Sequence, residues 1–427
     1  MSAPTVSRPA SPSTRLSVRH LLIIVTGCML TLGCSALAFS TWGLFQPLVA
    51  EKLGVTQAQF AGYVTVMYLT MTALSPLAGK ILQNTDVRLV LSVAALLVAG
   101  GFLIMSVATT IWLFYLAGVV MGSGTIFILW LAVPTLINRW FAKQAGLIIG
   151  ICMAFTGVGG ALWSAVFTVL TTSGVDFHGL YRLWALIAVL TSLPFTLFAV
   201  RDRPSDVGLL PYGTDLRATG TTPPARGLTA AQAMRSPVFY VLCLGAGVIN
   251  IAVLIAMQFP AYAKSLTGVS WDRVVVGGVM STLMMTGQAI GKVTIGLVAD
   301  RSPRGALLFA VSAAVAGVLL CWLGAGSLPL LYTGAFIFGF FYATALVLVP
   351  VLARTVFGVR EYPIIYSRVS MVFNLIAAFA SVFWASLGST FGFAAVFVVG
   401  LALIGVVLVT CGYVVRSAGS LQARWNE

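Results

Sequence analysis

Lys292 and Arg368 are two cationic side chains that lie inside long hydrophobic segments of this 427-residue chain. The ten acidic residues all fall in loops, at the ends of the hydrophobic segments or in a tail. Because a charge is costly in hydrocarbon, one that remains there usually faces a cavity and serves a pathway. Two buried cations without a buried anion therefore predict a binding site for a small anionic molecule.

The composition predicts an integral membrane protein. The chain is 59% hydrophobic and 8% charged, with a mean hydropathy of +1.03, whereas soluble domains carry about 25% charged residues. The net charge of +14 could indicate a nucleic-acid partner, but the cations form no basic stripe with interleaved aromatics. The six cysteines lie in apolar runs without metal-binding spacing, so we expect neither metal nor disulfide.

Twelve hydrophobic runs are each near or above the ~20 residues that a helix needs to cross a bilayer. A backbone exposed to lipid must satisfy its own hydrogen bonds, so each run is predicted to be helical. The predicted spans are 21–47, 57–80, 88–107, 111–137, 146–171, 180–200, 237–262, 274–299, 304–323, 328–353, 363–389 and 391–415.

A polar linker rich in Pro, Gly and Thr, over residues 201–236, divides these spans into two sets of six. The predicted fold class is therefore all-α, with an N-terminal six-helix half at 21–200 and a C-terminal half at 237–416. Residues 1–20 and 417–427 are expected to be cytoplasmic tails.

The distribution of basic residues predicts the orientation. With the N-terminus inside, 18 of the 24 Lys and Arg residues fall in inner segments and 4 in outer loops. This excess is the positive-inside pattern, so both termini are predicted to be cytoplasmic. We expect a multi-pass protein of a bacterial inner membrane.

The loop after the eighth span carries a charged motif, which reads Gly296-Leu-Val-Ala-Asp300-Arg301-Ser-Pro-Arg304-Gly305. It is similar to G-x-x-x-D-R-x-x-R-G, the cytoplasmic signature of the major facilitator superfamily. The resemblance implies the major facilitator fold and gives Asp300, Arg301 and Arg304 a gating role, with Asp300 paired to a cation across the bundle. The equivalent loop after the second span, 79–88, has Gln-Asn in place of Asp-Arg, which predicts a weaker gate.

A second motif, Asn138-Arg139-Trp140-Phe141 followed by a basic loop and a glycine-rich run to Gly160, resembles the monocarboxylate and oxalate/formate transporters. The segment 203–213, Phe357-Gly358 and Tyr366 agree with that resemblance. It implies that Arg139 belongs to the gating residues. It also implies that Lys292, which stands where those proteins have a substrate-binding arginine, binds a carboxylate.

Lys292 departs from that pattern because an ammonium is a point charge, whereas guanidinium grips a carboxylate in a bidentate fork. Gln288 occupies the position of the aspartate implicated in proton coupling, and Phe373 that of a second, deeper cation. Arg368 lies about five residues nearer the cytoplasm, ~9 Å into its span, where it could contact substrate or form a cytoplasmic gate. Lys292 lies ~12 Å deep, too far to reach the interface easily.

Further polar and aromatic residues of the spans could line a cavity. Gln288 is one turn from Lys292 on the same helix face. Asn and Gln within spans more often bridge helices than bind ligand, and a single aromatic more often packs or faces lipid. The other candidates are Trp42, Gln46, Tyr68, Trp130, Asn250, Gln258, Tyr342 and Asn374.

The sequence favours a secondary transporter that moves a small organic carboxylate across the bilayer as a monomer, by proton symport or anion exchange. No phosphate-binding loop or catalytic constellation is present, so we expect no enzyme, no cofactor and no use of ATP. Without an acid in the spans, a desolvated Lys292 could carry a coupled proton, and transport of the anion alone, as uniport, is also possible.

The alternative is a carrier of a larger or neutral solute, such as a vitamin or drug. A membrane sensor without transport is disfavoured because no soluble domain is present.

Overall fold

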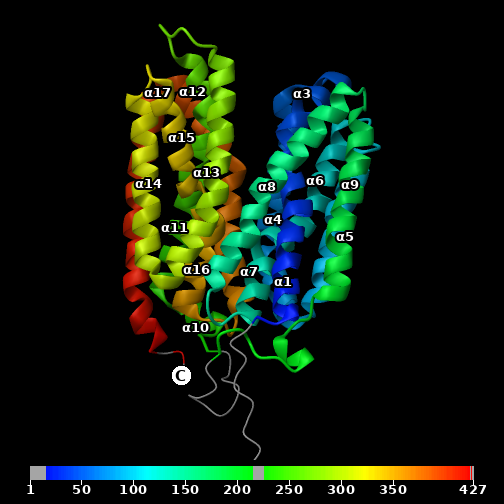
Figure 1. Ribbon diagram of the computed structural model, residues 1–427, viewed down its shortest axis with the longest axis vertical. Helices are drawn as coiled ribbons and strands as arrows, with labels where there is room; N and C mark the ends of the chain where they lie inside the picture. Colours follow the sequence, from blue (N-terminus) through cyan, green and yellow to red (C-terminus); the bar gives the residue numbers. More distant parts are fainter. Residues whose placement is uncertain (1–15, 215–225, 424, 426–427) are drawn as a thin grey trace, which may run out of the picture.

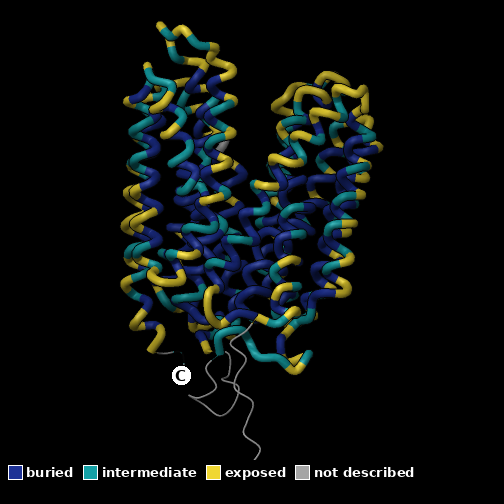
Figure 2. The backbone as a smooth tube through the Cα atoms, viewed as in Figure 1, coloured by how far each residue is buried: buried dark blue, intermediate teal, exposed yellow. Residues whose placement is uncertain are grey.

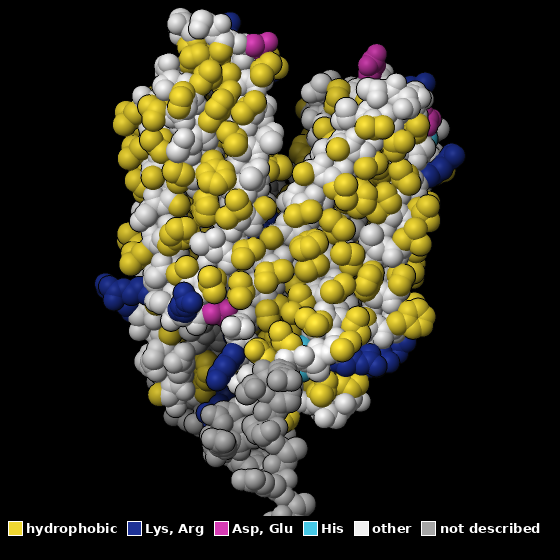
Figure 3. Space-filling view, viewed as in Figure 1, with side chains coloured by type: hydrophobic (Ala, Val, Ile, Leu, Met, Phe, Trp, Pro, Cys, Tyr) yellow, Lys and Arg dark blue, Asp and Glu magenta, His cyan; other side chains and the backbone are white. Residues whose placement is uncertain are grey.

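The computed structural model describes residues 16–214, 226–423 and 425. The predicted all-α fold is confirmed: the structure is 86% helical, its described part has no strand, and twelve helices are long and apolar enough to cross a membrane. The chain is therefore a multi-pass membrane protein. Charged side chains lie toward its two ends, and a hydrophobic surface lies between them (Figure 3).

The N-terminal half contains the first six spans. Span 1 is broken into four pieces, α1 (Val18–Leu30), η1 (Thr31–Ser35), α2 (Ala36–Ser40) and α3 (Trp42–Leu53). The remaining spans are α4 (Gln57–Asn84), α5 (Val87–Met105), α6 with η2 and α7 (Ile111–Thr125, Ile126–Ala132, Val133–Trp140), α8 (Ala145–Thr172) and α9 with η3 (Phe177–Pro194, Phe195–Ala199).

The linker contributes two short helices, η4 (Pro204–Val207) and α10 (Ala230–Arg235). Span 7 then combines α11 (Pro237–Val253), η6 (Leu254–Gln258) and α12 (Phe259–Ser265). The C-terminal half continues with α13 (Arg273–Arg301), α14 (Pro303–Leu323), α15 and α16 (Leu328–Tyr342, Thr344–Phe357) and α17 (Tyr362–Gln422). Spans 11 and 12 both belong to α17 and meet at Gly392, where φ is 78°, a value that glycine adopts without strain.

Carboxylates begin several helices, which explains why the acidic residues lie at helix ends. Asp86, Asp176 and Asp272 each accept a 2.8 Å hydrogen bond from a backbone N–H in the first turn of the helix that follows. These side chains satisfy donors that the helix itself leaves free. Two further carboxylates, Asp300 and Glu361, accept from the N-termini of helices that are distant in sequence.

The two halves stand side by side, one formed by α1 to α9 and the other by α11 to α17 (Figure 1). They meet at the end where α1 begins and where the linker and the C-terminal residues lie, which we call the linker end. They diverge at the opposite end, the groove end, and Figure 3 shows an open groove between them there. Buried residues fill the middle and the linker-end part (Figure 2). The conformation is therefore closed at the linker end and open at the groove end.

Glycines allow the close approach of the halves at the linker end. A Cβ on Gly150 of α8 would lie 2.2 Å from the carbonyl oxygen of Lys292 in α13, and one on Gly296 would lie 2.2 Å from that of Gly146. A Cβ on Gly79 of α4 would lie 2.1 Å from Ser367 Oγ in α17. Helices α8 and α13 form one seam between the halves, and α4 and α17 form the other.

The helical hydrogen-bonding pattern is interrupted in spans 1, 4, 7 and 10, the first span of each successive group of three, and also near the end of span 6, where η3 is π-helical. Span 1 has the π-helical turn η1, span 4 the π-helical η2, and span 7 the 3₁₀ segment η6. Span 10 is divided at Ala343, between α15 and α16. Interrupted membrane helices expose backbone groups where they line a cavity and often mark functional sites.

Candidate functional site

Lys292 lies on α13 at the seam with α8, and its side chain is 1% exposed. Its Nζ donates to Thr156 Oγ1 of α8 at 2.6 Å and to Gln288 Oε1 of α13 at 2.8 Å. Both acceptors are neutral, and Lys292 forms no ion pair within the described residues. An ammonium has three donors, so one N–H remains for a further partner. A buried cation of this kind is stabilised by an anion that approaches it.

A layer of aromatic and amide side chains lies between spans 4 and 11. Trp130 of η2 contacts Phe373 of α17, with ring centroids 4.4 Å apart. Trp130 Nε1 and both amide atoms of the fully buried Asn374 lack hydrogen-bond partners in the described part of the chain. Because unpartnered buried polar groups are costly, these atoms are available to a ligand.

The other predicted lining residues divide into helix bridges and partly buried side chains. Asn250 Nδ2 donates to the carbonyl oxygen of Phe373 at 2.7 Å, so it joins spans 7 and 11. Gln46 Nε2 donates to the carbonyl oxygen of Gln57 at 3.0 Å, at the groove end of α4. Neither amide contacts Lys292. The partly buried side chains are Trp42, Tyr68, Gln258 and Tyr342.

Arg368 does not lie at the same site as Lys292. Its Nη1 contacts Sδ of Met234 in the linker helix α10, so it lies against the linker. Glu361, which is near it in sequence, accepts a 2.7 Å hydrogen bond from the backbone N–H of Ala230 at the start of α10. The position of Arg368 fits the gate interpretation rather than the substrate contact.

Asp300 joins the two halves at the linker end, but its partner differs from the predicted cation. Its two carboxylate oxygens accept hydrogen bonds from the backbone N–H groups of Gly146 (2.8 Å) and Leu147 (2.7 Å), in the first turn of α8. A helix N-terminus carries partial positive charge and free donors, so it takes the place of the cation. Arg301 and Arg304 are exposed and form no ion pair among the described residues.

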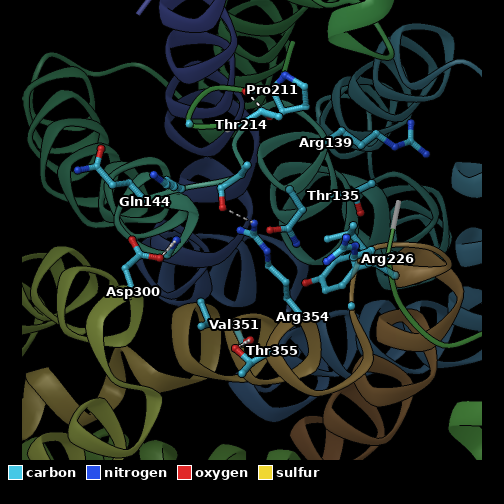
Figure 4. A pocket seen from close by; sticks show the side chains of 18 of the residues that line it. Thr135, Arg139, Gln144, Pro211, Thr214, Arg226, Asp300, Val351, Arg354 and Thr355 are labelled. Carbon is cyan, nitrogen blue, oxygen red and sulfur yellow. Dashed lines mark hydrogen bonds between the residues drawn. The ribbon is translucent and has the colours of Figure 1, made fainter. Parts of the chain in front are cut away.

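Arg139, the other predicted gating residue, does not form a contact between the two halves. It forms an ion pair with Asp202 and donates to the carbonyl oxygen of Leu82 at 3.0 Å, both in its own half or at the start of the linker. Arg354, which the sequence interpretation missed, does join the halves. Its Nη2 donates to the carbonyl oxygens of Phe141 and Ala142, at 3.1 Å each (Figure 4).

The loop after span 2 makes a smaller contribution to closure, in line with its degenerate motif. Gln83 Nε2 donates to the carbonyl oxygen of Arg360 at 3.1 Å. This is one neutral hydrogen bond, whereas Asp300 accepts two charge-assisted bonds, which are about twice as strong. The two related loops therefore close the linker end unequally.

These features define a helical membrane carrier built from two six-helix halves. The chain belongs to the Major Facilitator Superfamily, whose family model matches residues 28–282 and 265–423. Members of this family are transporters and not enzymes.

Two relatives and one solved structure illustrate the similarity. An MFS-type transporter of Aspergillus fumigatus is 23% identical over 346 residues, which cover 78% of this chain and 77% of that protein. The agnestins efflux protein AgnL12 of Paecilomyces divaricatus is 23% identical over 329 residues, 76% of this chain and 71% of that protein. The crystal structure of the Escherichia coli fucose:proton symporter FucP matches with a TM-score of 0.70 at 13% identity, covering 93% and 98% of the two chains.

Proposed function

We propose that this protein carries a small organic carboxylate across the membrane by alternating access, with Lys292 as the residue that binds the carboxylate. The observation that carries this proposal is the environment of the Lys292 ammonium, which has two neutral partners and one free N–H. A carboxylate supplied from the groove would neutralise the buried charge. The matching arginine of the monocarboxylate and oxalate/formate transporters supports the same assignment by resemblance.

The position of Lys292 links substrate binding to the movement of the halves. Its hydrogen bond to Thr156 crosses from α13 to α8, so a carboxylate that takes over this N–H would loosen the seam from inside. The Asp300 and Arg354 contacts lie on the linker side of it and would have to break before release. Rocking of the halves about a central site is the mechanism that this architecture permits.

The ion that could be coupled to carboxylate transport is limited by the charged side chains of the spans. The acidic side chains of the sequence lie outside the apolar cores of the spans, so a proton would have to be carried by Lys292 itself. Exchange for a second anion satisfies the same buried charge without any proton.

The excess of basic residues on the linker side supports cytoplasmic termini in a bacterial inner membrane.

Uptake by proteoliposomes tests the proposal. Lys292→Gln removes the charge but keeps a polar side chain that is one bond shorter, and we expect it to abolish uptake of a carboxylate that the wild type transports. Lys292→Arg should retain part of it. Lys52→Gln, which removes an exposed lysine at the end of α3, is the matched control and should leave uptake unchanged. Normal carboxylate uptake by Lys292→Gln would overturn the assignment.

The second candidate function is transport of a larger or neutral solute. It is favoured by the Trp130–Phe373 ring pair and by the similarity to a protein named for efflux of agnestins. Competition between a panel of carboxylates and a panel of neutral aromatic compounds distinguishes the two. If only the neutral compounds compete, Lys292 has a structural role.

A further inference from the structure

A second cationic site lies at the linker end, beyond the contacts that close the two halves. A cavity of about 1510 Å³ is lined there by the ends of spans 4 and 10, the loops that follow them, the linker and parts of α13 and α17. The described residues that line it include seven Lys and Arg side chains and one acid, Asp300. It is separated from Lys292, which is not among its lining residues.

Among the residues that the structure describes, most cations of this cavity form no ion pair. Of its seven cations, only Arg139 and Arg203 form ion pairs within the described residues, both with Asp202. Lys143, Arg226, Arg301, Arg354 and Arg360 form none there. The two oxygens of Asp300 are occupied by backbone N–H groups of α8. A concave surface with one sign of charge concentrates ions of the opposite sign.

Two buried polar side chains in this cavity also lack hydrogen-bond partners in the described part of the chain. Thr135 and Asn138 of α7 are 2% and 7% exposed, and both line the cavity. Among the described residues, neither the Thr135 hydroxyl nor either amide atom of Asn138 forms a hydrogen bond. The Tyr362 hydroxyl, which also lines the cavity, donates to the carbonyl oxygen of Pro350 at 3.4 Å. Buried polar groups of this kind usually take a ligand or an ordered water as their partner.

Thr135 and Asn138 belong to a short sequence motif that is repeated around Arg354 in the other half. The end of span 4 reads Val-Pro-Thr-Leu-Ile-Asn-Arg-Trp-Phe over 133–141, and the end of span 10 reads Val-Pro-Val-Leu-Ala-Arg-Thr-Val-Phe over 349–357. Asn138 and Arg354 are therefore equivalent positions of the two halves. Residues three apart share a helix face, so Thr135 with Asn138 and Val351 with Arg354 face the cavity from α7 and α16. Figure 4 shows Thr135 and Arg354 around it.

The linker completes the wall of this site by pairing with both repeats. The N–H of Tyr212 donates to the carbonyl oxygen of Trp140 at 2.8 Å, and the N–H of Leu228 donates to that of Phe357 at 2.9 Å. Arg354 uses Nη2 for the carbonyl oxygens of the neighbouring loop. Its remaining N–H groups, the Asn138 amide and the Thr135 hydroxyl are thus available at the inner end of the cavity.

We propose that this linker-end cavity is a second anion-binding site, which binds a carboxylate or phosphate group between Arg354 of one half and Asn138 and Thr135 of the other. The ligand is a small organic or inorganic anion, or the phosphate of a lipid headgroup. Since it contacts both halves in the conformation closed at the linker end, its binding stabilises that conformation. The site does not depend on the function proposed for Lys292.

Thermal unfolding of the purified full-length protein with inorganic phosphate or citrate, at constant ionic strength, tests this site. The test variant is Thr135→Val with Asn138→Leu, which removes the free polar groups at similar volume and leaves Arg354 in place. Thr355→Val is the matched control, because this hydroxyl also lines the cavity but donates to the carbonyl oxygen of Val351 in its own helix. Lys292→Gln separates the two sites.

We expect phosphate or citrate to raise the unfolding temperature of the wild type, Thr355→Val and Lys292→Gln with saturation. The double variant should bind about ten-fold or more weakly, because hydrogen bonds to a charged group are lost. An equal shift in the double variant, or a shift lost in Lys292→Gln, would overturn the proposal.

A second arm distinguishes a free anion from a lipid. In it, phosphatidylcholine nanodiscs with and without phosphatidylglycerol replace the detergent and the free anion. Stabilisation by phosphatidylglycerol that the double variant loses assigns the site to a headgroup phosphate. Stabilisation in neither arm contradicts the proposal.

Discussion

Lys292 Nζ of α13 and Thr156 Oγ1 of α8 are 2.6 Å apart, so the buried charge of the C-terminal half is held by a hydroxyl of the N-terminal half. The contact lies on the groove side of the Asp300 bonds to the first turn of α8. The same pair of helices therefore carries both the candidate substrate contact and the gate. In the mechanism that we propose, substrate binding and gate opening are coupled through this one seam.

Replacement of Thr156 by Val tests the role of this hydroxyl. Removing an acceptor from a buried ammonium costs about 1.5–3 kcal/mol, so the unfolding temperature of the ligand-free protein should fall. A saturating carboxylate should recover most of the loss, because it provides the missing acceptor. Thr156→Ser retains the hydroxyl and serves as the control; an equal loss with and without carboxylate would contradict this account.

Replacement of Asp300 by Ala removes the cap of α8 and should loosen the linker end. The loss of a cap costs about 0.5–2 kcal/mol, which shifts the population toward the conformation open on that side. Spin labels at Asn84→Cys and Arg416→Cys, both exposed positions in opposite halves, should show a longer distance component. The native cysteines are buried. Arg304→Ala should not change the distance; if it has the same effect, the cap is not the gate.

Replacement of Gly150 by Ala should impair both stability and transport. The added Cβ would lie 2.2 Å from the Lys292 carbonyl oxygen, and overpacking of this kind costs about 1–3 kcal/mol. Gly405→Ala is the matched control, since nothing lies within 4 Å of the new Cβ in its helix. Comparison of unfolding temperatures and uptake checks the prediction, which fails if both variants behave alike.

Replacement of Asn374 by Leu should stabilise the ligand-free protein, because its buried amide lacks partners in the described residues and such a group costs about 1–3 kcal/mol. Asn250→Leu should do the opposite, since that amide donates to the Phe373 carbonyl oxygen. Calorimetric unfolding of both variants is the measurement. Equal destabilisation of the two variants would mean that the Asn374 amide has a hydrogen-bond partner and would contradict this prediction.

The twelve spans could be predicted from sequence because lipid demands long apolar helices, and hydropathy reports that demand directly. The breaks η1, η2 and η6 could not be, since they depend on how neighbouring helices pack. The contact between Lys292 and Gln288 followed from their spacing on one helix face. The Thr156 acceptor and the Asp300 partner did not, because they lie 136 and more than 150 residues away in the chain.

Arg354 was missed for a different reason. It lies near the end of a span, where the sequence interpretation counted it only among the loop cations. Comparison of the two halves provides the missing signal, because Arg354 repeats the position of Asn138 in the Val-Pro motif. For Arg368 the sequence left both substrate contact and a cytoplasmic gate open, because depth along a span does not say which way a side chain points.

Thermal unfolding of the wild type and Lys292→Gln across a broad organic-anion library tests whether Lys292 binds the substrate carboxylate. A ligand that binds the native state stabilises it by mass action. One class of carboxylates should stabilise the wild type, and Lys292→Gln should lose this effect. Stabilisation by neutral compounds alone, unchanged in Lys292→Gln, would contradict this prediction.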